Sequence, residues 1–265
     1  MIGIFDSGVG GMTVARAIEK KLPHHRLIYF GDLARTPYGS KSPETIRKYA
    51  RQNTEFLLSR GAKIILIACN SAASVASELL REEFPVPIFE VITPAVKKAI
   101  VNTKNGRIGV IGTRATIKSR IYEQKIQDLR PDFKVFVSPC PLLVPLVEEG
   151  WLNKRETKMI VRRYLHPLKM KTIDTLVLGC THYPLLKKLI GSRIGKRVRV
   201  IDSSREIAAD LHSFLAENPE VAKTLSSGGE SKYYVSDVTQ AAMETAERIF
   251  GRKIELKLSQ QTSND

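Results

Sequence analysis

Two kinds of segment alternate along this chain: short, fully apolar runs and longer stretches whose apolar residues recur every three or four positions. The short runs, such as Ile64–Ala68 and Thr175–Leu178, are typical of strands buried on both faces, as in a parallel sheet. The longer stretches are typical of amphipathic helices that cover such a sheet. Strict alternation of the two predicts an α/β fold.

The strand–helix pattern runs through the chain twice, and Ile2-Gly-Ile4 in the first pass matches Ile108-Gly-Val110 in the second. We therefore predict two pseudo-symmetric, parallel-sheet α/β domains. The other predicted strands are Leu27–Phe30, Ile88–Val91, Phe133–Ser138 and Arg199–Ile201. We assign residues 1–93 and 205–258 to the first domain and 94–204 to the second. The stretch after residue 204 is expected to hold two helices and a strand at Tyr233–Val235, and the polar residues 259–265 are expected to be disordered.

Local signals predict where several helices begin and end. A helix should follow the glycine-rich turn at Met12–Lys21, and another should run from Pro43 to Arg60 and stop at Gly61. Asn70 or Ser71 is the natural N-cap of a helix that reaches Glu83. Further helices are expected from the turn at Thr113 to Leu129 and from Cys180 to Ile194. The segment 37–40 has turn composition and is predicted to be a surface loop.

Cys69 and Cys180 each lie just past a predicted buried strand, where a helix begins. Ligands of parallel sheets bind beyond the carboxyl ends of the strands, so two facing domains would direct both thiols into one cleft. A helix N-terminus lowers the pKa of a thiol from ~8.5 and also receives carboxylates. The pattern predicts a domain-interface site that moves a proton at the α-carbon of an acidic amino acid. We expect the two sulfurs to face each other across a closed pocket large enough for a five-carbon diacid.

Three polar residues fit this scheme. His182 is placed to shuttle a proton at Cys180, and Asp6, at the end of the first strand, could do the same on the Cys69 side. Glu148 is expected to line the cleft, although a solvated loop carboxylate is an equally good interpretation. Burial as a small hydrophobe is the alternative for any cysteine, and we interpret Cys140 in that way. No zinc motif matches the spacing of these cysteines and histidine, so we expect no metal.

Five segments of the chain, taken together, resemble glutamate racemase. They are Asp6-Ser-Gly-Val-Gly-Gly11, Pro37-Tyr-Gly39, Ala68-Cys-Asn-Ser-Ala72, Cys140–Gly150 and Leu178–Leu185. The resemblance runs in order from residue 2 to about residue 215. It implies cofactor-independent interconversion of L- and D-glutamate, which supplies D-glutamate for peptidoglycan, in a homodimer. Aspartate racemases tend to have glutamate where this chain has His182, so the resemblance favours the glutamate branch over the aspartate branch.

Carried over residue by residue, the resemblance implies that Cys69 and Cys180 donate and accept the α-proton, with Asp6 and His182 as auxiliary groups. It implies substrate contacts from Asp6, Ser7, Pro37, Tyr38, Gly39, Asn70, Ser71, Thr181 and His182. Ser71 replaces the family's usual threonine but keeps a hydroxyl for a carboxylate. The chain has no extension before its first strand of the kind that some relatives use for regulation by a peptidoglycan precursor, so we expect no such activation.

Composition adds few constraints. The 265 residues are 43% hydrophobic and 26% charged, as in ordinary globular proteins. No apolar run approaches the ~20 residues that span a membrane, and the chain opens on a core strand, so we expect a cytoplasmic protein with no membrane partner. The net charge of +15 makes nucleic-acid binding the alternative function. The basic residues are spread over helix faces without interleaved aromatics, so we rank that alternative second.

Overall fold

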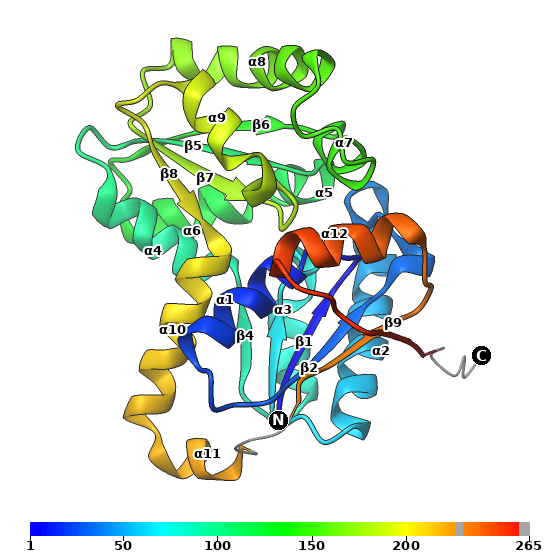
Figure 1. Ribbon diagram of the computed structural model, residues 1–265. Helices are drawn as coiled ribbons and strands as arrows, with labels where there is room; N and C mark the ends of the chain where they lie inside the picture. The colour runs from blue at the N-terminus through cyan, green and yellow to red at the C-terminus, as the bar shows by residue number, and fades with distance from the viewer. Residues whose placement is uncertain (226–229, 260–265) are drawn as a thin grey trace.

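The computed structural model describes residues 1–225 and 230–259, which form two parallel sheets, each covered by helices (Figure 1). Its strands pair only in parallel within each sheet. The prediction of two parallel-sheet α/β domains is therefore confirmed. The exact domain boundaries stay a prediction.

The six strands of the first sheet lie in the order β10-β9-β2-β1-β3-β4. They are β1 (Ile2–Asp6), β2 (Leu27–Gly31), β3 (Ile64–Ile67), β4 (Ile88–Glu90), β9 (Lys232–Val235) and β10 (Leu256–Leu258). The central strands β1, β2 and β3 are buried along their whole length, which explains why their sequences are continuous apolar runs. Strands from both ends of the sequence thus complete one sheet.

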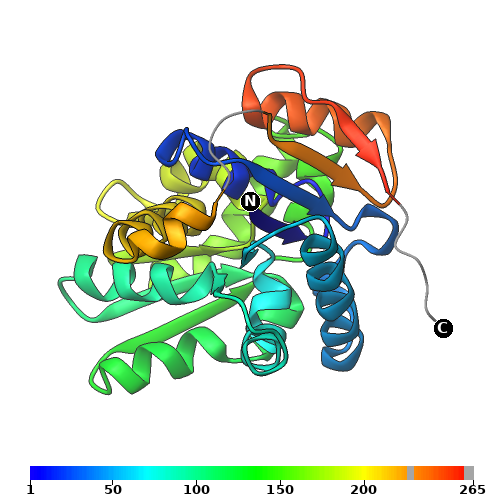
Figure 2. The ribbon, with the colours of Figure 1, turned by 90° about the horizontal axis from the view of Figure 1, so that it is seen from below.

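Helices cover both faces of the first sheet, with α1 and α2 on opposite sides (Figure 2). The helices packed around this sheet are α1 (Met12–Lys21), α2 (Pro43–Ser59), α3 (Asn70–Glu83), α10 (Ser203–Glu217), α11 (Pro219–Thr224) and α12 (Gln240–Phe250). Two short 3-10 helices, η1 (Leu33–Arg35) and η2 (Tyr38–Ser40), follow β2.

The four strands of the second sheet lie in the order β6-β5-β7-β8. They are β5 (Arg107–Gly112), β6 (Lys134–Pro139), β7 (Thr175–Gly179) and β8 (Arg199–Asp202). The accompanying helices are α4 (Ile92–Asn102), α5 (Arg114–Lys118), α6 (Ile121–Leu129), α7 (Leu143–Glu148), α8 (Arg155–Met170), the 3-10 helix η3 (Tyr183–Leu186) and α9 (Lys187–Ile194).

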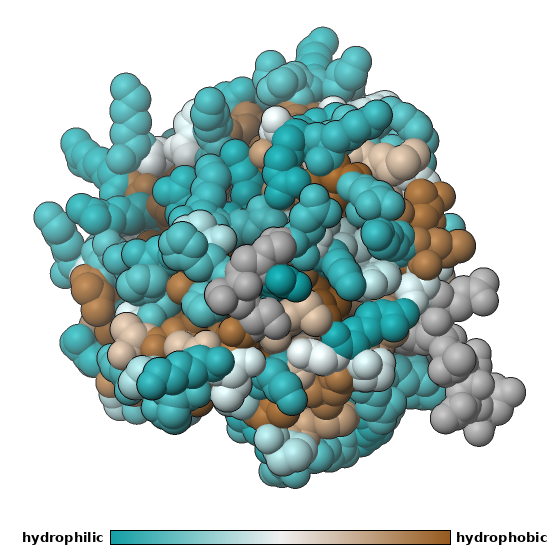
Figure 3. Space-filling model, turned by 60° about the horizontal axis from the view of Figure 1, so that its bottom comes forward, coloured by the Kyte–Doolittle hydropathy of each residue, from teal (hydrophilic) through white to brown (hydrophobic). Residues whose placement is uncertain are grey.

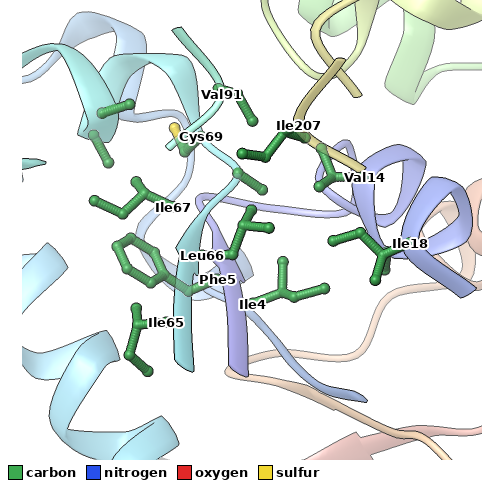
Figure 4. Close-up of a cluster of buried hydrophobic side chains, with 14 of the residues drawn as sticks. Ile4, Phe5, Val14, Ile18, Ile65, Leu66, Ile67, Cys69, Val91 and Ile207 are labelled. Carbon is green, nitrogen blue, oxygen red and sulfur yellow. The ribbon is translucent and has the colours of Figure 1, made fainter. Parts of the chain in front are cut away.

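One hydrophobic core extends through the first sheet and into the second domain, where it includes Val110 and Val177. In Figure 4, the side chains of Phe5 and Leu66 pack in this core, and Cys69 lies just beyond the end of the strand that carries Ile67. The core therefore fixes the carboxyl edge of the sheet, from which Cys69 projects.

Several predicted elements differ from the structure. The described residues after 204 contain three helices and two strands. The prediction missed α11 and the three-residue edge strand β10 because both are too short to leave a hydrophobic pattern. The helix predicted from Thr113 to Leu129 is two helices, separated where Arg120 adopts a left-handed φ of 59°. The helix predicted after Cys180 begins as a 3-10 turn. Of the predicted tail, Ser259 donates its backbone N–H to Val235, and residues 260–265 lie outside the described residues.

One local interpretation was wrong and another holds only in part. The N-cap of α3 is Cys69 itself, without a side-chain capping bond, so Asn70 and Ser71 lie inside the helix. The segment 37–40 lies at the surface through Pro37 and Ser40, but the side chain of Tyr38 is fully buried, and its hydroxyl donates to Asp32 and accepts a hydrogen bond from Asn53. By contrast, Gly61 does end its helix, with a φ of 85°.

Candidate active site

Cys69 is held in a buried position between the end of β3 and the start of α3. Its Sγ lies 3.5 Å from the Ser7 Oγ, to which it donates. Burial raises the pKa of the Cys69 thiol to about 12, and the negative charge of Asp6 adds to the effect. The hydrogen bond between Cys69 and Ser7 and the one with the Ala72 backbone oppose this rise without cancelling it. The lowered pKa expected for Cys69 from the helix N-terminus is therefore wrong, and Cys69 is a neutral thiol at neutral pH.

Cys180 follows β7 in the second domain and contacts an ionic pair. Its Sγ lies 3.8 Å from His182 Nδ1, and His182 Nε2 lies 3.1 Å from Glu148 Oε1. Burial alone lowers the pKa of His182, but the bonds to Cys180 and Glu148 outweigh it and raise the pKa to about 10. His182 is consequently a cation at neutral pH, placed between a carboxylate and a sulfur. Glu148 therefore lies behind His182, with its side chain still partly exposed to solvent.

Asp6 is fully buried and joins the two domains. Its Oδ2 accepts the N–H groups of Gly8 and Gly11, each at 3.0 Å, and its Oδ1 accepts the hydroxyl of Thr181 at 3.3 Å. Burial raises the pKa of Asp6, while the positive charge of His182 and these hydrogen bonds oppose the shift. Asp6 thus fixes the glycine-rich turn after β1 against the segment that carries Cys180.

The glycines of this turn are required by close packing. A Cβ at Gly10 would lie 2.5 Å from His182 Nδ1, and a Cβ at Gly11 would lie 2.3 Å from the Asp6 Cβ. Only a residue without a side chain allows this approach. The glycine-rich turn after β1 is therefore a site where the backbone of one domain meets the histidine of the other.

Both cysteines line one cavity between the domains. The cavity is lined by Ser7, Thr36, Pro37, Tyr38, Gly39, Cys69, Asn70, Ser71, Thr113, Val144, Cys180, Thr181 and His182. The structure thus brings together the predicted site residues around this space, except that Asp6 and Glu148 lie behind its wall. Tyr38 borders the cavity while its hydroxyl is turned toward Asp32.

The cavity is smaller than expected. Its volume is about 20 Å³, room for about a single water molecule. The expectation of a pocket large enough for a five-carbon diacid is therefore wrong for this conformation. A substrate of that size can enter only if the walls move apart.

Thr113, Thr36 and Val144 were not predicted as lining residues. Thr113 Oγ1 lies 2.8 Å from Ser71 Oγ, which places a hydroxyl of the second domain against the first. A signal for it was present in the sequence, since the repeat that aligns Ile4 with Val110 also aligns Ser7 with Thr113. Thr36 and Val144 lie in loop or short-helix segments whose path no pattern indicated.

Asn70 has one amide atom ready for a ligand. Its Oδ1 accepts the hydroxyl of Tyr122 from α6 at 2.8 Å, while its Nδ2 is buried and has no partner among the described residues. A buried donor without a partner is costly unless a ligand or water satisfies it. The site therefore offers a free N–H donor, two thiols, several hydroxyls and the N-terminus of α3. No cluster of three or more His, Cys, Asp or Glu in residues 1–225 and 230–259 is suited to hold a metal ion.

Comparison with known proteins agrees with this geometry. Residues 12–211 match the model of the Asp/Glu/Hydantoin racemase family. Glutamate racemases from Geobacter metallireducens and Aquifex aeolicus are each 44% identical, covering 96% and 97% of this chain and 93% and 97% of their own. A crystal structure of glutamate racemase from Bacillus anthracis superposes with a TM-score of 0.92 at 36% identity, covering 98% of this chain and 97% of that one. One from Francisella tularensis, in complex with D-glutamate, gives 0.91 at 35%, with coverage of 99% and 98%.

The fold, with one thiol from each domain lining the same interdomain cavity, is that of an amino-acid racemase. The chain belongs to the Asp/Glu/Hydantoin racemase family and, within it, to the glutamate racemases. None of the helices in the described part of the chain is long and apolar enough to cross a membrane.

Proposed function

We propose that this protein interconverts L- and D-glutamate, with Cys69 and Cys180 as the two acid–base groups. The observation that supports the proposal most directly is that one thiol from each domain lines the same interdomain cavity. Similarity to glutamate racemases, including one in complex with D-glutamate, supports glutamate as the substrate.

Two opposed groups suit inversion at a carbon centre. A base on one face of the α-carbon removes its proton, and an acid on the other face delivers a new one. A single base would return the proton to the face from which it came. Thiols on elements of different domains are suited to opposite faces of one substrate carbon.

The ionisation of the groups around the cavity supports different roles for the two thiols, one as proton donor and the other as proton acceptor. Cys69 is protonated at neutral pH because burial raises its pKa to about 12, so it is ready to donate. The His182 cation lies 3.8 Å from the Cys180 sulfur and stabilises negative charge there. With Cys69 as the proton donor, Cys180 accepts the α-proton on the other face, and the two thiols exchange these roles in the reverse reaction.

The carboxylates of glutamate require donors. The free Nδ2 of Asn70 and the hydroxyls of Ser71 and Thr113 border the cavity and can supply them. The unpaired backbone N–H groups at the start of α3 add positive potential. Because the α-proton is a very weak acid, these fixed donors and the exclusion of water must stabilise the carbanion. No cofactor is needed in this scheme.

The test is the loss of racemisation in each single cysteine variant. Cys69→Ser and Cys180→Ser should each lower kcat by at least about a thousandfold, since each removes one of the two proton-transfer groups. The rate is measured by circular dichroism of D-glutamate in heavy water, together with deuterium incorporation at the α-carbon. Full activity in either variant would contradict the two-base proposal. Cys140→Ser is the matched control, because Cys140 is buried in the core of the second domain and should stay active.

We further propose a homodimer that supplies D-glutamate for peptidoglycan in the cytoplasm, as the family resemblance suggests. Growth of a D-glutamate-requiring bacterium on expression of the chain tests the role, and sedimentation equilibrium tests the dimer. A strain that still requires D-glutamate, or a monomer at micromolar concentration, would contradict the respective statement.

A further inference from the structure

A second cavity, outside the cysteine site, has a volume of about 760 Å³. Four helices surround it: α1, α10 and α12 with the first sheet, and α9 with the second. These four helices lie together on the side of the molecule that faces the viewer in Figure 1. We call this cavity the basic groove. Its volume falls in the range of ~300–1,000 Å³ that is usual for small-ligand sites.

Seven cationic side chains and one carboxylate line the basic groove. The cations are Arg16, Lys20, Lys21, Lys187, Lys188, Arg205 and Arg248, and the carboxylate is Asp202. Asp202 is shared by Lys187 at 3.4 Å and Arg205 at 4.0 Å. The other five cations form no ion pair within residues 1–225 and 230–259. The groove therefore carries a large uncompensated positive charge.

This arrangement differs from a solvated helix face. The cations come from both domains and converge on one concavity, where they repel one another. Lys187 and Lys188 occupy the first turn of α9, which contains no acidic residue, and positive charge there opposes the helix dipole. Apolar side chains between the cations, among them Leu185 and Ile249, reduce the water that would screen the charges. Such a cluster is stabilised when an anion lies between its members.

We propose that the basic groove binds a small polyvalent anion that carries phosphate groups. Arg and Lys side chains on two facing walls are suited to the several oxygens of such a ligand. A nucleic acid fits less well, because no aromatic residue lines the groove as a platform for base stacking. Elsewhere, hydrophilic and hydrophobic side chains are mixed over the face seen in Figure 3, as on an ordinary solvated surface.

The groove shares a wall with the cysteine site. Thr13 lines the groove, and its hydroxyl donates to the backbone oxygen of Thr181 at 3.1 Å. Pro184 and Leu185, also in the groove wall, lie two and three residues after His182 in the chain. An anion that binds cations of both domains holds the two domains together, whereas entry of substrate into the cysteine site requires the domains to separate. Bound anion should therefore lower kcat/KM for glutamate, an effect that rests on the proposed racemase function.

The test is direct titration with inorganic tripolyphosphate by isothermal calorimetry at low and high salt. Wild type should bind about one equivalent, more weakly at high salt because the attraction is screened. Lys187→Gln/Lys188→Gln and, separately, Arg16→Gln/Lys20→Gln should each weaken binding at least about tenfold, since each removes two charge-assisted contacts. The control is Lys158→Gln/Lys169→Gln, which removes two exposed lysines of α8 and should bind as wild type does. Circular dichroism shows which variants are folded.

Each result of these experiments bears on a different part of the proposal: the site, the class of ligand or the link to the cysteine site. No binding at low salt, or equal loss in the control, overturns the site, because charge anywhere on the surface would then suffice. A single-stranded oligonucleotide that binds more tightly than tripolyphosphate, and is lost in the same groove variants, overturns the small-anion assignment. Binding without any change in kcat/KM overturns only the link to the cysteine site. The calorimetric result does not depend on racemisation, so it stands even if the proposed function fails.

Discussion

At the scale of single residues, the ionisation of His182 depends on two neighbours that compete with burial. The imidazole is 3% exposed, an environment that disfavours a cation, yet its pKa rises to about 10 because Cys180 and Glu148 both bind it. Glu148 is the more accessible partner, with a side chain 33% exposed. A substitution of Glu148 can therefore test the charge of His182 while the sulfur of Cys180 stays unchanged.

Glu148→Gln should lower the pKa of His182 and move the alkaline limit of activity to lower pH. The glutamine keeps the shape of the contact but removes the negative charge that stabilises the imidazolium. The pH profile of kcat/KM for D-glutamate checks this. A profile that overlays that of wild type would show that Glu148 does not set the charge of His182.

The same variant should change stability in a pH-dependent way. The folded-state pKa of about 10 exceeds the ~6.5 of an unfolded histidine, so proton binding stabilises the folded state. This contribution is fully present below pH ~6.5 and is lost as the pH rises through 10. Urea unfolding should thus show Glu148→Gln to be less stable than wild type near neutral pH, with a difference that shrinks toward pH 10. A constant difference would point to packing instead of charge.

Alanine substitutions at two glycines can distinguish the effect of a steric contact from the effect of glycine on the backbone. Gly10→Ala would place a Cβ 2.5 Å from His182 Nδ1, and we expect a loss of about 1–3 kcal/mol in unfolding free energy together with lower kcat. Gly191→Ala in α9 meets no atom within 4 Å, and alanine there should stabilise the helix by up to ~1 kcal/mol. Urea denaturation and racemisation assays of both proteins check this. Equal effects would exclude the contact with His182 as the cause.

The sequence alone predicted the positions of the two thiols, because both directly follow apolar strands. In parallel α/β sheets, ligands bind beyond the carboxyl ends of such strands. The sequence could not predict ionisation, since the shift at Cys69 comes from burial and from Asp6, which tertiary packing brings close. The inward orientation of the Tyr38 side chain could not be predicted for a similar reason. Its hydrogen-bond partners Asp32 and Asn53 lie at the end of a strand and in a helix, and no local sequence pattern indicates that these two elements lie close together.

At the scale of elements, a hydrogen bond connects α6 of the second domain with the first residue of α3 in the first. The buried Tyr122 donates to Asn70 Oδ1 at 2.8 Å, which fixes the side chain whose Nδ2 is free. Neither helix could make this contact without the other. The predicted repeat indicated that both helices exist, but the broken helix at Arg120 sets where Tyr122 points.

Tyr122→Phe should weaken glutamate binding more than it slows the chemical step. Loss of one buried hydrogen bond costs about 0.5–1.5 kcal/mol, which corresponds to a KM roughly two- to tenfold higher. Steady-state kinetics with D-glutamate measures both constants. Tyr234→Phe, in β9 of the first sheet, is the matched control and should leave KM unchanged. A fall in kcat alone would assign Tyr122 to another role.

At the scale of the whole molecule, the small volume between the domains makes their separation a necessary step of the reaction. The cavity of about 20 Å³ is closed by contacts such as Thr181 with Asp6 and Thr113 with Ser71, which come from different domains. Hydrogen bonds of this kind are few and weak enough to break during turnover. Sequence patterns predicted both sheets but not their separation, because the contacts involve single hydroxyls far apart in the chain.

D-Glutamate should slow amide hydrogen exchange on both sides of the cavity. If exchange at Ser71 and His182 passes through the open, unliganded state, saturation at about 100 times Kd should slow it by about 100-fold. Exchange mass spectrometry of peptides that contain these residues checks this. The peptide around Ile4, in the core strand β1, serves as the control that should not change. Equal protection of all three peptides would indicate global stabilisation instead of domain closure.

The return of the chain to its first sheet has a consequence for synthesis. β9 pairs with β2 across about two hundred intervening residues, and β10 pairs with β9. All four strands of the second sheet leave the ribosome before either of them. The nascent protein must therefore keep the outer edge of β2 unpaired while a complete neighbouring sheet already exists. A chaperone that shields that edge would act on translation intermediates of this protein, and the finished chain would have no further use for it.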